Sequence, residues 1–137
     1  MPFVIDNSIV VAAILGEDDA LAEACLVQLA SSSAVAPYIW PAEFANALWS
    51  AERRQRLTAA QASQALAIGL ALGIAVEDAL PPAQVFGAVH SLARLTQLSV
   101  YDALYLELAM RRGLPLATLD TALARAADAV GVARWKP

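Results

Sequence analysis

Apolar residues recur at two different spacings along this chain, and together they predict short strands alternating with helices. Three apolar segments, at 3–5, 34–36 and 74–76, are short and rich in Val, Ile and Ala, as buried strands are. A fourth, 114–118, follows Gly113. Longer segments with helical spacing separate these four. The alternation predicts an α/β fold in which a short central parallel sheet is wrapped by helices.

The helical segments carry their own end signals. Thr58 is a typical N-cap residue, and Gly16, Gly113 and Gly131 each follow the last apolar position of a helical run. The predicted helices cover 9–15, about 20–30, a run from Pro41 to the arginines near 53, 58–72, 83–95, 103–112 and 123–130, and a last edge strand is expected at 132–135.

The length of 137 residues predicts one domain, 1–137, with room for a real core. Because 59% of the residues are hydrophobic and 16% are charged, a membrane protein has to be considered. The longest uncharged run, 57–76, is interrupted by polar residues, and its remaining apolar block, 65–76, is too short for a span. We therefore expect a buried helix there and no membrane segment.

The chain has one cysteine, Cys25, and one histidine, His90. An intrachain disulfide is therefore impossible, a zinc site is disfavoured, and the cytoplasm is the expected compartment. A net charge of −4 excludes a protein that coats nucleic acid by bulk charge. The high apolar fraction suggests that a partner covers part of the surface.

Four acidic residues stand where predicted helices begin. Asp6 and Asp120 each follow a strand, Asp102 precedes the helix at 103–112, and Glu43 lies in a first helical turn. In a parallel sheet such positions share the carboxyl edge, where ligands bind. Each acid also has a structural alternative: Asp6 and Asp120 as N-caps, Asp102 as the end of a Ser-x-x-Asp capping pattern, and Glu43 as a partner of the helix dipole.

Four carboxylates at one edge repel each other unless a cation neutralises them. Oxygen ligands suit Mg²⁺ or Mn²⁺, and such a cluster supports metal-assisted phosphoryl chemistry. Ser8 and Thr118 lie two residues from Asp6 and Asp120, so their hydroxyls could hold a metal-bound water or, alternatively, cap helices.

These residues resemble the motifs of the PIN-domain nucleases, and within them the VapC-type toxins of bacterial toxin–antitoxin pairs. Val4–Ser8 looks like the family's opening strand and first acid, and Glu43 with Asn46 is similar to its helical Glu motif. Tyr101–Tyr105 resembles the third-acid motif, and Thr118–Asp120 the closing one. The likeness covers nearly the whole chain.

The resemblance implies a three-layer PIN-like fold and a Mg²⁺-dependent endoribonuclease toxin, with Mn²⁺ as an alternative metal. Asp6, Glu43, Asp102 and Asp120 would be the catalytic and metal-binding acids, supported by Ser8, Thr118 and Asn46. A VapB-type antitoxin would hold the toxin inactive by packing its C-terminal segment against it. A homodimer is also implied.

Five arginines are candidate RNA contacts: Arg53, Arg54, Arg56, Arg111 and Arg112. Each cluster ends a predicted helix that carries one of the acids, and guanidinium groups bind phosphates. The alternative is structural, because basic residues favour helix C-termini and Glu107 can pair with Arg111 at i,i+4.

Two rival classes share parts of this pattern. A haloacid-dehalogenase-like phosphatase or a receiver domain needs a lysine near its acids, whereas the only lysine here is Lys136, and Ser8 stands where the phosphatase has a second acid. A non-catalytic PIN-like binding module shares every residue with the nuclease, so the sequence leaves that alternative open.

Overall fold

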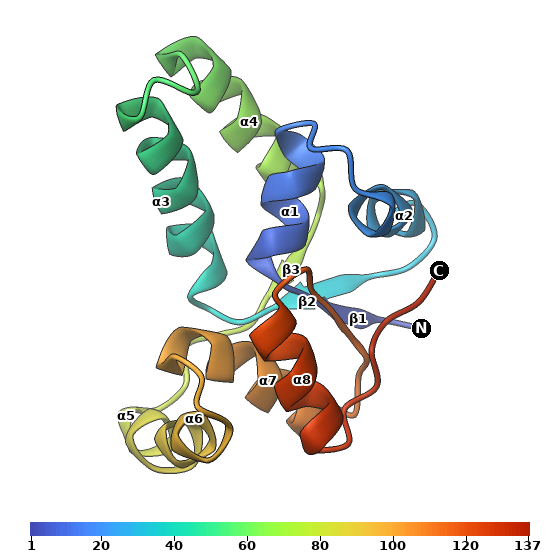
Figure 1. Cartoon of the computed structure of the whole chain (residues 1–137), viewed down its shortest axis with the longest axis vertical. Coiled ribbons are helices and arrows are strands. Elements are labelled where there is room, and N and C mark those ends of the chain that lie inside the picture. Colours follow the sequence, from blue (N-terminus) through green and yellow to red (C-terminus); the bar gives the residue numbers. More distant parts are fainter.

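Four short strands form one parallel sheet at the centre of the molecule, with helices on both sides (Figure 1). The computed structural model describes residues 1–137. The strands are β1 (Phe3–Ile5), β2 (Ala34–Ala36), β3 (Ala75–Val76) and β4 (Leu116–Ala117), in the order β3-β2-β1-β4. The predicted α/β fold with a short parallel sheet between helical layers is therefore confirmed.

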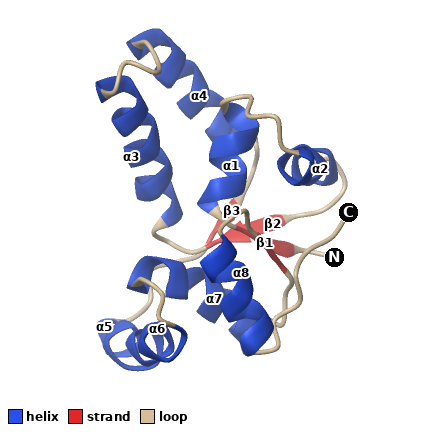
Figure 2. Cartoon of the chain, viewed as in Figure 1, coloured by secondary structure: helices blue, strands red, loops and turns tan.

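The helices follow the predicted order closely (Figure 2). Helices α3 and α4 pack side by side and project away from the sheet, whereas α7 packs directly on β1 and β4 (Figure 1). The helices are α1 (Asn7–Ile14), α2 (Ala20–Gln28), α3 (Trp40–Arg53), α4 (Ala59–Ala71), α5 (Pro82–Gln84), the π-helical segment η1 (Val85–Val89), α6 (His90–Thr96), α7 (Val100–Arg112) and α8 (Thr121–Ala129).

Strand β1 is the centre of both the sheet and the core. Its residues are fully buried, as expected for a parallel strand covered on both faces. It pairs on one side with β2 and on the other with β4, with Val4 opposite Val35 and Leu116. The chain therefore leaves β1 for one side of the sheet and later returns to the other, which makes the carboxyl end of β1 a topological switch point.

Two element boundaries differ from the prediction. The expected helix at 103–112 begins three residues earlier, because the Ser99 hydroxyl accepts the backbone N–H of Asp102 at 3.1 Å and caps α7. Asp102 thus lies in the first turn. The expected helix at 83–95 is divided by η1, whose wider turns span Val85–Val89.

The expected edge strand at 132–135 is reduced to one parallel bridge between Leu116 and Arg134. Strand β4 has only two residues, so little backbone is available for pairing. Two backbone hydrogen bonds of 2.9 Å still join the last segment to Leu116, from the Leu116 N–H to the Ala133 carbonyl and from the Trp135 N–H to the Leu116 carbonyl. The Trp135 ring also stacks on Phe3 at a centroid distance of 5.1 Å.

The prediction of a buried helix at 65–76 is wrong. The side chains of Leu66 and Leu70 on α4 are 43% and 87% exposed, because α4 packs mainly against α3 and α1. The buried stripe consists of small residues such as Ala65 and Gly69. No helix of the structure is long and apolar enough to cross a membrane.

Replacing Gly69 with Ala tests the close packing of α3 on α4. A Cβ atom at Gly69 would lie 2.6 Å from Cε2 of the buried Phe44 ring, so the ring or the helix has to shift. We expect Gly69→Ala to lower the free energy of unfolding by about 1–3 kcal/mol in urea titrations. Gly87→Ala is the control, because nothing lies within 4 Å of its added methyl group; equal stability of both variants would contradict the packing.

Candidate active site

The Asp6 carboxylate is the one buried charged or polar side chain of the core, with 5% of its surface exposed. One of its oxygens, Oδ2, accepts hydrogen bonds from the Ser8 hydroxyl at 2.6 Å and from the Thr118 hydroxyl at 2.7 Å. Asp6 makes no side-chain capping bond to α1, so the N-cap alternative is wrong for this residue. Two hydroxyl donors orient the carboxylate instead, and neither of them binds Oδ1.

Ser8 and Thr118 also tie the loop after β4 to the start of α1. The Ser8 hydroxyl accepts the backbone N–H of Leu119 at 3.0 Å, and the Thr118 hydroxyl accepts that of Asp120 at the same distance. Both hydroxyls therefore link Asp6 to the segment that carries Asp120. The alternative that Ser8 and Thr118 serve as helix caps is not what the structure shows.

Asp120 is an N-cap, as its structural alternative predicted. Its Oδ1 accepts the backbone N–H of Leu123 at 2.9 Å at the start of α8. One carboxylate oxygen is thus engaged in the cap. The charge of Asp120 raises the pKa of Asp6, so the two carboxylates lie within electrostatic range of each other.

Glu43 lies in the first turn of α3 and is oriented from α7. The Tyr105 hydroxyl donates a hydrogen bond of 2.7 Å to its Oε1. Tyr105 is fully buried one turn beyond Asp102, so this bond joins two acidic segments that are 62 residues apart in the chain. Burial and the bond to Glu43 both raise the pKa of Tyr105, which keeps its hydroxyl a donor.

The acids act on one another through their charges, which help to raise the pKa of Asp6, Glu43 and Asp102. Burial raises the pKa of Asp6 and Glu43, with further increases from the charges of Asp120 on Asp6 and of Asp6 and Asp102 on Glu43. Hydrogen bonds from Ser8, Thr118 and Tyr105 oppose these increases. The pKa of Asp102 rises to about 6, first through burial and then through the charges of Asp6 and Asp120, against the Ser99 hydroxyl.

No basic side chain compensates this charge. All ion pairs of the structure involve other acids, namely Glu77, Glu107 and Asp128. No three His, Cys, Asp or Glu side chains lie close enough together to hold a metal ion between them in their present positions. The acids are thus within electrostatic range of each other but do not form an assembled coordination shell.

The donor chemistry nevertheless fits a hard divalent cation. The groups facing the edge are carboxylate and hydroxyl oxygens, which are typical ligands of Mg²⁺ and Mn²⁺, and neither sulfur nor imidazole is among them. The four carboxylates repel each other where no counter-ion compensates them, so we expect them to lie further apart than in a site that holds a cation. Asp6, Glu43, Asp102 and Asp120 are the residues that would hold it.

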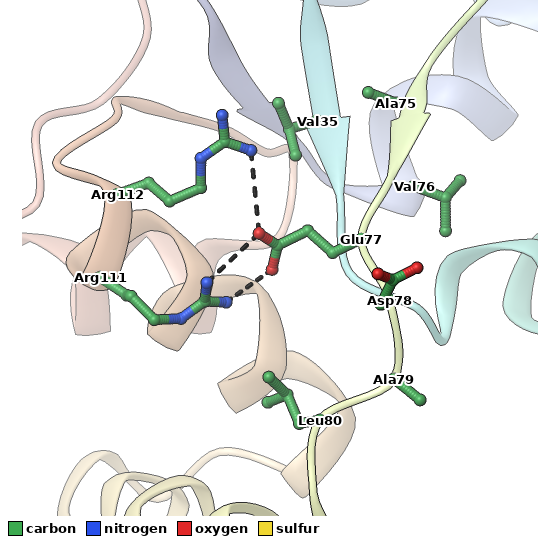
Figure 3. Close-up of a pocket in the computed structure, with 9 residues that line it drawn as sticks. All are labelled: Val35, Ala75, Val76, Glu77, Asp78, Ala79, Leu80, Arg111 and Arg112. Carbon is green, nitrogen blue, oxygen red and sulfur yellow. Dashed lines mark hydrogen bonds and ion pairs between the residues drawn. The ribbon is translucent and has the colours of Figure 1, made fainter.

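The five candidate arginines are not part of this cluster. Arg111 and Arg112 end α7, nine and ten residues beyond Asp102. Both face Glu77 in a hollow beside β3 (Figure 3). Arg111 pairs with Glu77 at 2.5 Å and with Glu107 at 2.7 Å, so the predicted i,i+4 pair is confirmed. These contacts favour the structural alternative for Arg111.

The other three arginines are exposed where α3 ends. Arg53 is the last residue of α3 and lies over the Trp49 ring at 5.9 Å, whereas Arg54 and Arg56 follow in the turn before α4. Glu43 stands ten residues earlier on α3, so these arginines lie roughly 15 Å along the helix from it. Their contact with RNA stays a prediction.

Two residues of the site carry no role in the sequence prediction. The sequence places Tyr105 in a motif without a role of its own. Two signals indicate a role in the site: Tyr105 lies one turn after Asp102, and a buried hydroxyl needs a hydrogen-bond partner. Asn7 lies beside Asp6, and its Oδ1 is buried without a hydrogen-bond partner. No spacing in the sequence indicates that an amide oxygen there is unpaired.

Comparison with known proteins places this geometry among related folds. Residues 3–129 of the chain match the model of the PIN domain family. No curated protein sequence matches the chain significantly. Among solved structures, PAE2754 from Pyrobaculum aerophilum superposes with a TM-score of 0.68 at 24% identity, over 92% of this chain and 84% of that one.

Two further structures cover nearly all of both chains. VapBC2 from Rickettsia felis, bound to a promoter DNA fragment, has a TM-score of 0.68 at 16% identity, over 98% of each chain. VapC20 from Mycobacterium tuberculosis, described as a toxin that cleaves the sarcin–ricin loop, has a TM-score of 0.66 at 21% identity, over 98% of this chain and 99% of that one. At these identities the similarity is one of fold.

The raised pKa of Asp102 predicts that Asp102→Asn stabilises the protein at about pH 8 but not at about pH 3. A carboxyl whose pKa is about 6 when folded and 3.8 when unfolded holds its proton longer in the folded state, so its stabilisation is complete below the lower value and is lost as pH rises through the higher one. We expect a gain of about 1 kcal/mol in the free energy of unfolding, reduced by solvent screening.

Urea titrations over this pH range measure the gain. Asp18→Asn, in the exposed loop between α1 and α2, is the matched control and should show no such difference. A gain in Asp102→Asn that is independent of pH would show that neither burial nor the neighbouring carboxylates raise the pKa of Asp102.

Proposed function

This chain belongs to the PIN-domain family, and from that premise we propose that it is a Mg²⁺- or Mn²⁺-dependent endoribonuclease of the VapC type. The observation that carries the proposal is the cluster of Asp6, Glu43, Asp102 and Asp120 at the switch point of the sheet, without a basic partner. Metal-assisted hydrolysis of an RNA phosphodiester needs a site that holds a divalent cation, a water and a phosphate together.

A bound divalent cation would activate the attacking water and stabilise charge on the attacking and leaving oxygens. The protein contributes orientation. Ser8 and Thr118 fix Oδ2 of Asp6, which leaves Oδ1 for the cation, and the cap of α8 leaves one oxygen of Asp120.

Glu43 is suited to a proton-transfer role. Tyr105 donates to Oε1, so Oε2 can orient a water or accept its proton, and burial with two neighbouring acids raises the pKa of the carboxyl toward the range useful for a general base. Asp102, with a pKa of about 6, ionises fully when a cation approaches.

The receiver class does not fit the sheet, and the phosphatase class stays disfavoured because Lys136 is the only lysine of the chain. A receiver domain has the strand order 2-1-3-4-5, whereas the order here is β3-β2-β1-β4. The non-catalytic binding module has the same fold and the same acids, so it is separated from the nuclease by activity alone.

An antitoxin partner is the second part of the proposal. Related folds include VapBC2 from Rickettsia felis and FitAcB from Neisseria gonorrhoeae. In this chain, Leu66 and Leu70 stand one turn apart on α4 with their side chains exposed, which offers an apolar surface for a partner segment. We propose that a VapB-type antitoxin covers this surface and neutralises the acids. A homodimer and a cytoplasmic location stay predictions.

Purified protein without antitoxin is expected to cleave RNA in Mg²⁺ or Mn²⁺ and to stop when the metal is chelated. Asp6→Asn, Glu43→Gln and Asp102→Asn should each lower kcat by roughly 100-fold or more, because each removes an oxygen charge from the site. Asp120→Asn should cost less, since Asn caps α8 about as well. Cleavage of labelled RNA by each variant provides the measurement.

Asp18→Asn again serves as the control, and circular dichroism should show that all variants are folded. Full activity of Asp102→Asn would show that its role is structural. Absence of cleavage by the wild-type protein across a broad RNA panel, with either metal, would contradict the nuclease and favour the binding module.

A further inference from the structure

A hollow of about 510 Å³ opens beside the acid cluster, and Glu43 is the one member of that cluster in its lining. Asn7 at the start of α1, Glu43 and Asn46 on α3, and Tyr101 in the first turn of α7 line it. Its volume lies within the range of roughly 300–1,000 Å³ typical of ligand sites. Because Glu43 belongs to both the hollow and the acid cluster, a ligand in the hollow would be adjacent to the reacting phosphate.

Tyr101 is a large aromatic residue that stays exposed in this lining. Its side chain is 58% exposed, although it precedes the half-buried Asp102 and belongs to a helix whose next residues are buried. An exposed ring in a hollow gains little from the protein itself. It does provide a face on which a planar group can stack, and stacking on aromatic side chains is how unpaired bases are held.

The polar part of the lining consists of two amides. Asn7 has a buried Oδ1 without a hydrogen-bond partner, and Asn46 is exposed on α3 one turn beyond Glu43. An unpaired buried amide oxygen is costly, so a donor from a ligand would stabilise the site. Asn side chains pair with the donor and acceptor groups on base edges.

We propose that this hollow binds one unpaired nucleobase of single-stranded RNA, next to the cleaved bond, with Tyr101 stacking on the base and Asn7 and Asn46 contacting its edge. The inference rests on the proposed ribonuclease function and adds a subsite for its substrate. The hollow has no basic side chain to bind a phosphate, whereas a neutral base is accepted there. The phosphate would be held by a cation at the acids, and the base would occupy the hollow.

The test compares Tyr101→Ala and Tyr101→Phe in the full chain on an RNA that the wild-type protein cleaves. Tyr101→Ala should raise KM by roughly 10-fold or more with a smaller change in kcat, since a stacking contact is lost while the acids are retained. Tyr101→Phe should keep KM close to the wild-type value, because its ring can still stack. Phe86→Ala, at an exposed ring outside the hollow, should change neither constant.

A second readout follows the base directly. The same RNA, kept uncleaved by chelating the divalent metal, carries 2-aminopurine at one position at a time. Fluorescence should be quenched on binding at one position beside the cleaved bond in the wild-type protein and Tyr101→Phe, and not in Tyr101→Ala. Replacing Asn7 with Ala should change the order of preference among bases at that position.

Each result decides between the alternatives. Cleavage by Tyr101→Ala with an unchanged KM and unchanged quenching would overturn the base subsite and leave the ribonuclease intact. Weaker binding of an antitoxin peptide by Tyr101→Ala, with RNA kinetics unaltered, would also overturn it and assign the hollow to a protein partner. Absence of cleavage by the wild-type protein would instead refute the proposed function itself, and the subsite with it.

Discussion

Asp6 is buried at the carboxyl end of the central strand, where two hydroxyl hydrogen bonds hold one oxygen of its carboxylate. A buried charge is costly unless hydrogen bonds or a counter-charge compensate it. Ser8 and Thr118 provide part of that compensation and, through Leu119 and Asp120, also join the start of α1 to the loop after β4. The constraint on this one carboxylate thus fixes the positions of neighbouring segments.

The other acids increase the cost instead of reducing it. Burial and the mutual repulsion of Asp6, Glu43, Asp102 and Asp120 raise the pKa of the first three, and no arginine or lysine forms an ion pair with any of them. Uncompensated negative charge that is partly buried at a topological switch point indicates a binding site for a ligand of opposite charge. We propose a hard divalent cation as this ligand, because the donor atoms are oxygens.

How much the sequence predicts depends on the range of the interaction involved. The alternation of strands and helices, the places of the four acids at helix starts and the Asp120 cap follow from local patterns. The bond from Tyr105 to Glu43 joins residues 62 positions apart, and the unpaired oxygen of Asn7 depends on packing, so neither has a local signature. The exposure of α4 was predicted wrongly because an apolar run does not reveal whether other elements cover it.

The most direct test of the account is Mn²⁺ binding by the free protein, followed by the loss of the electron paramagnetic resonance signal of unbound Mn²⁺. The account predicts saturable binding that is abolished in Asp6→Asn and weakened in Asp102→Asn, with Asp18→Asn binding like the wild-type protein. Absence of binding, or equal binding by all four proteins, would contradict the claim that the acid cluster is built for a divalent cation.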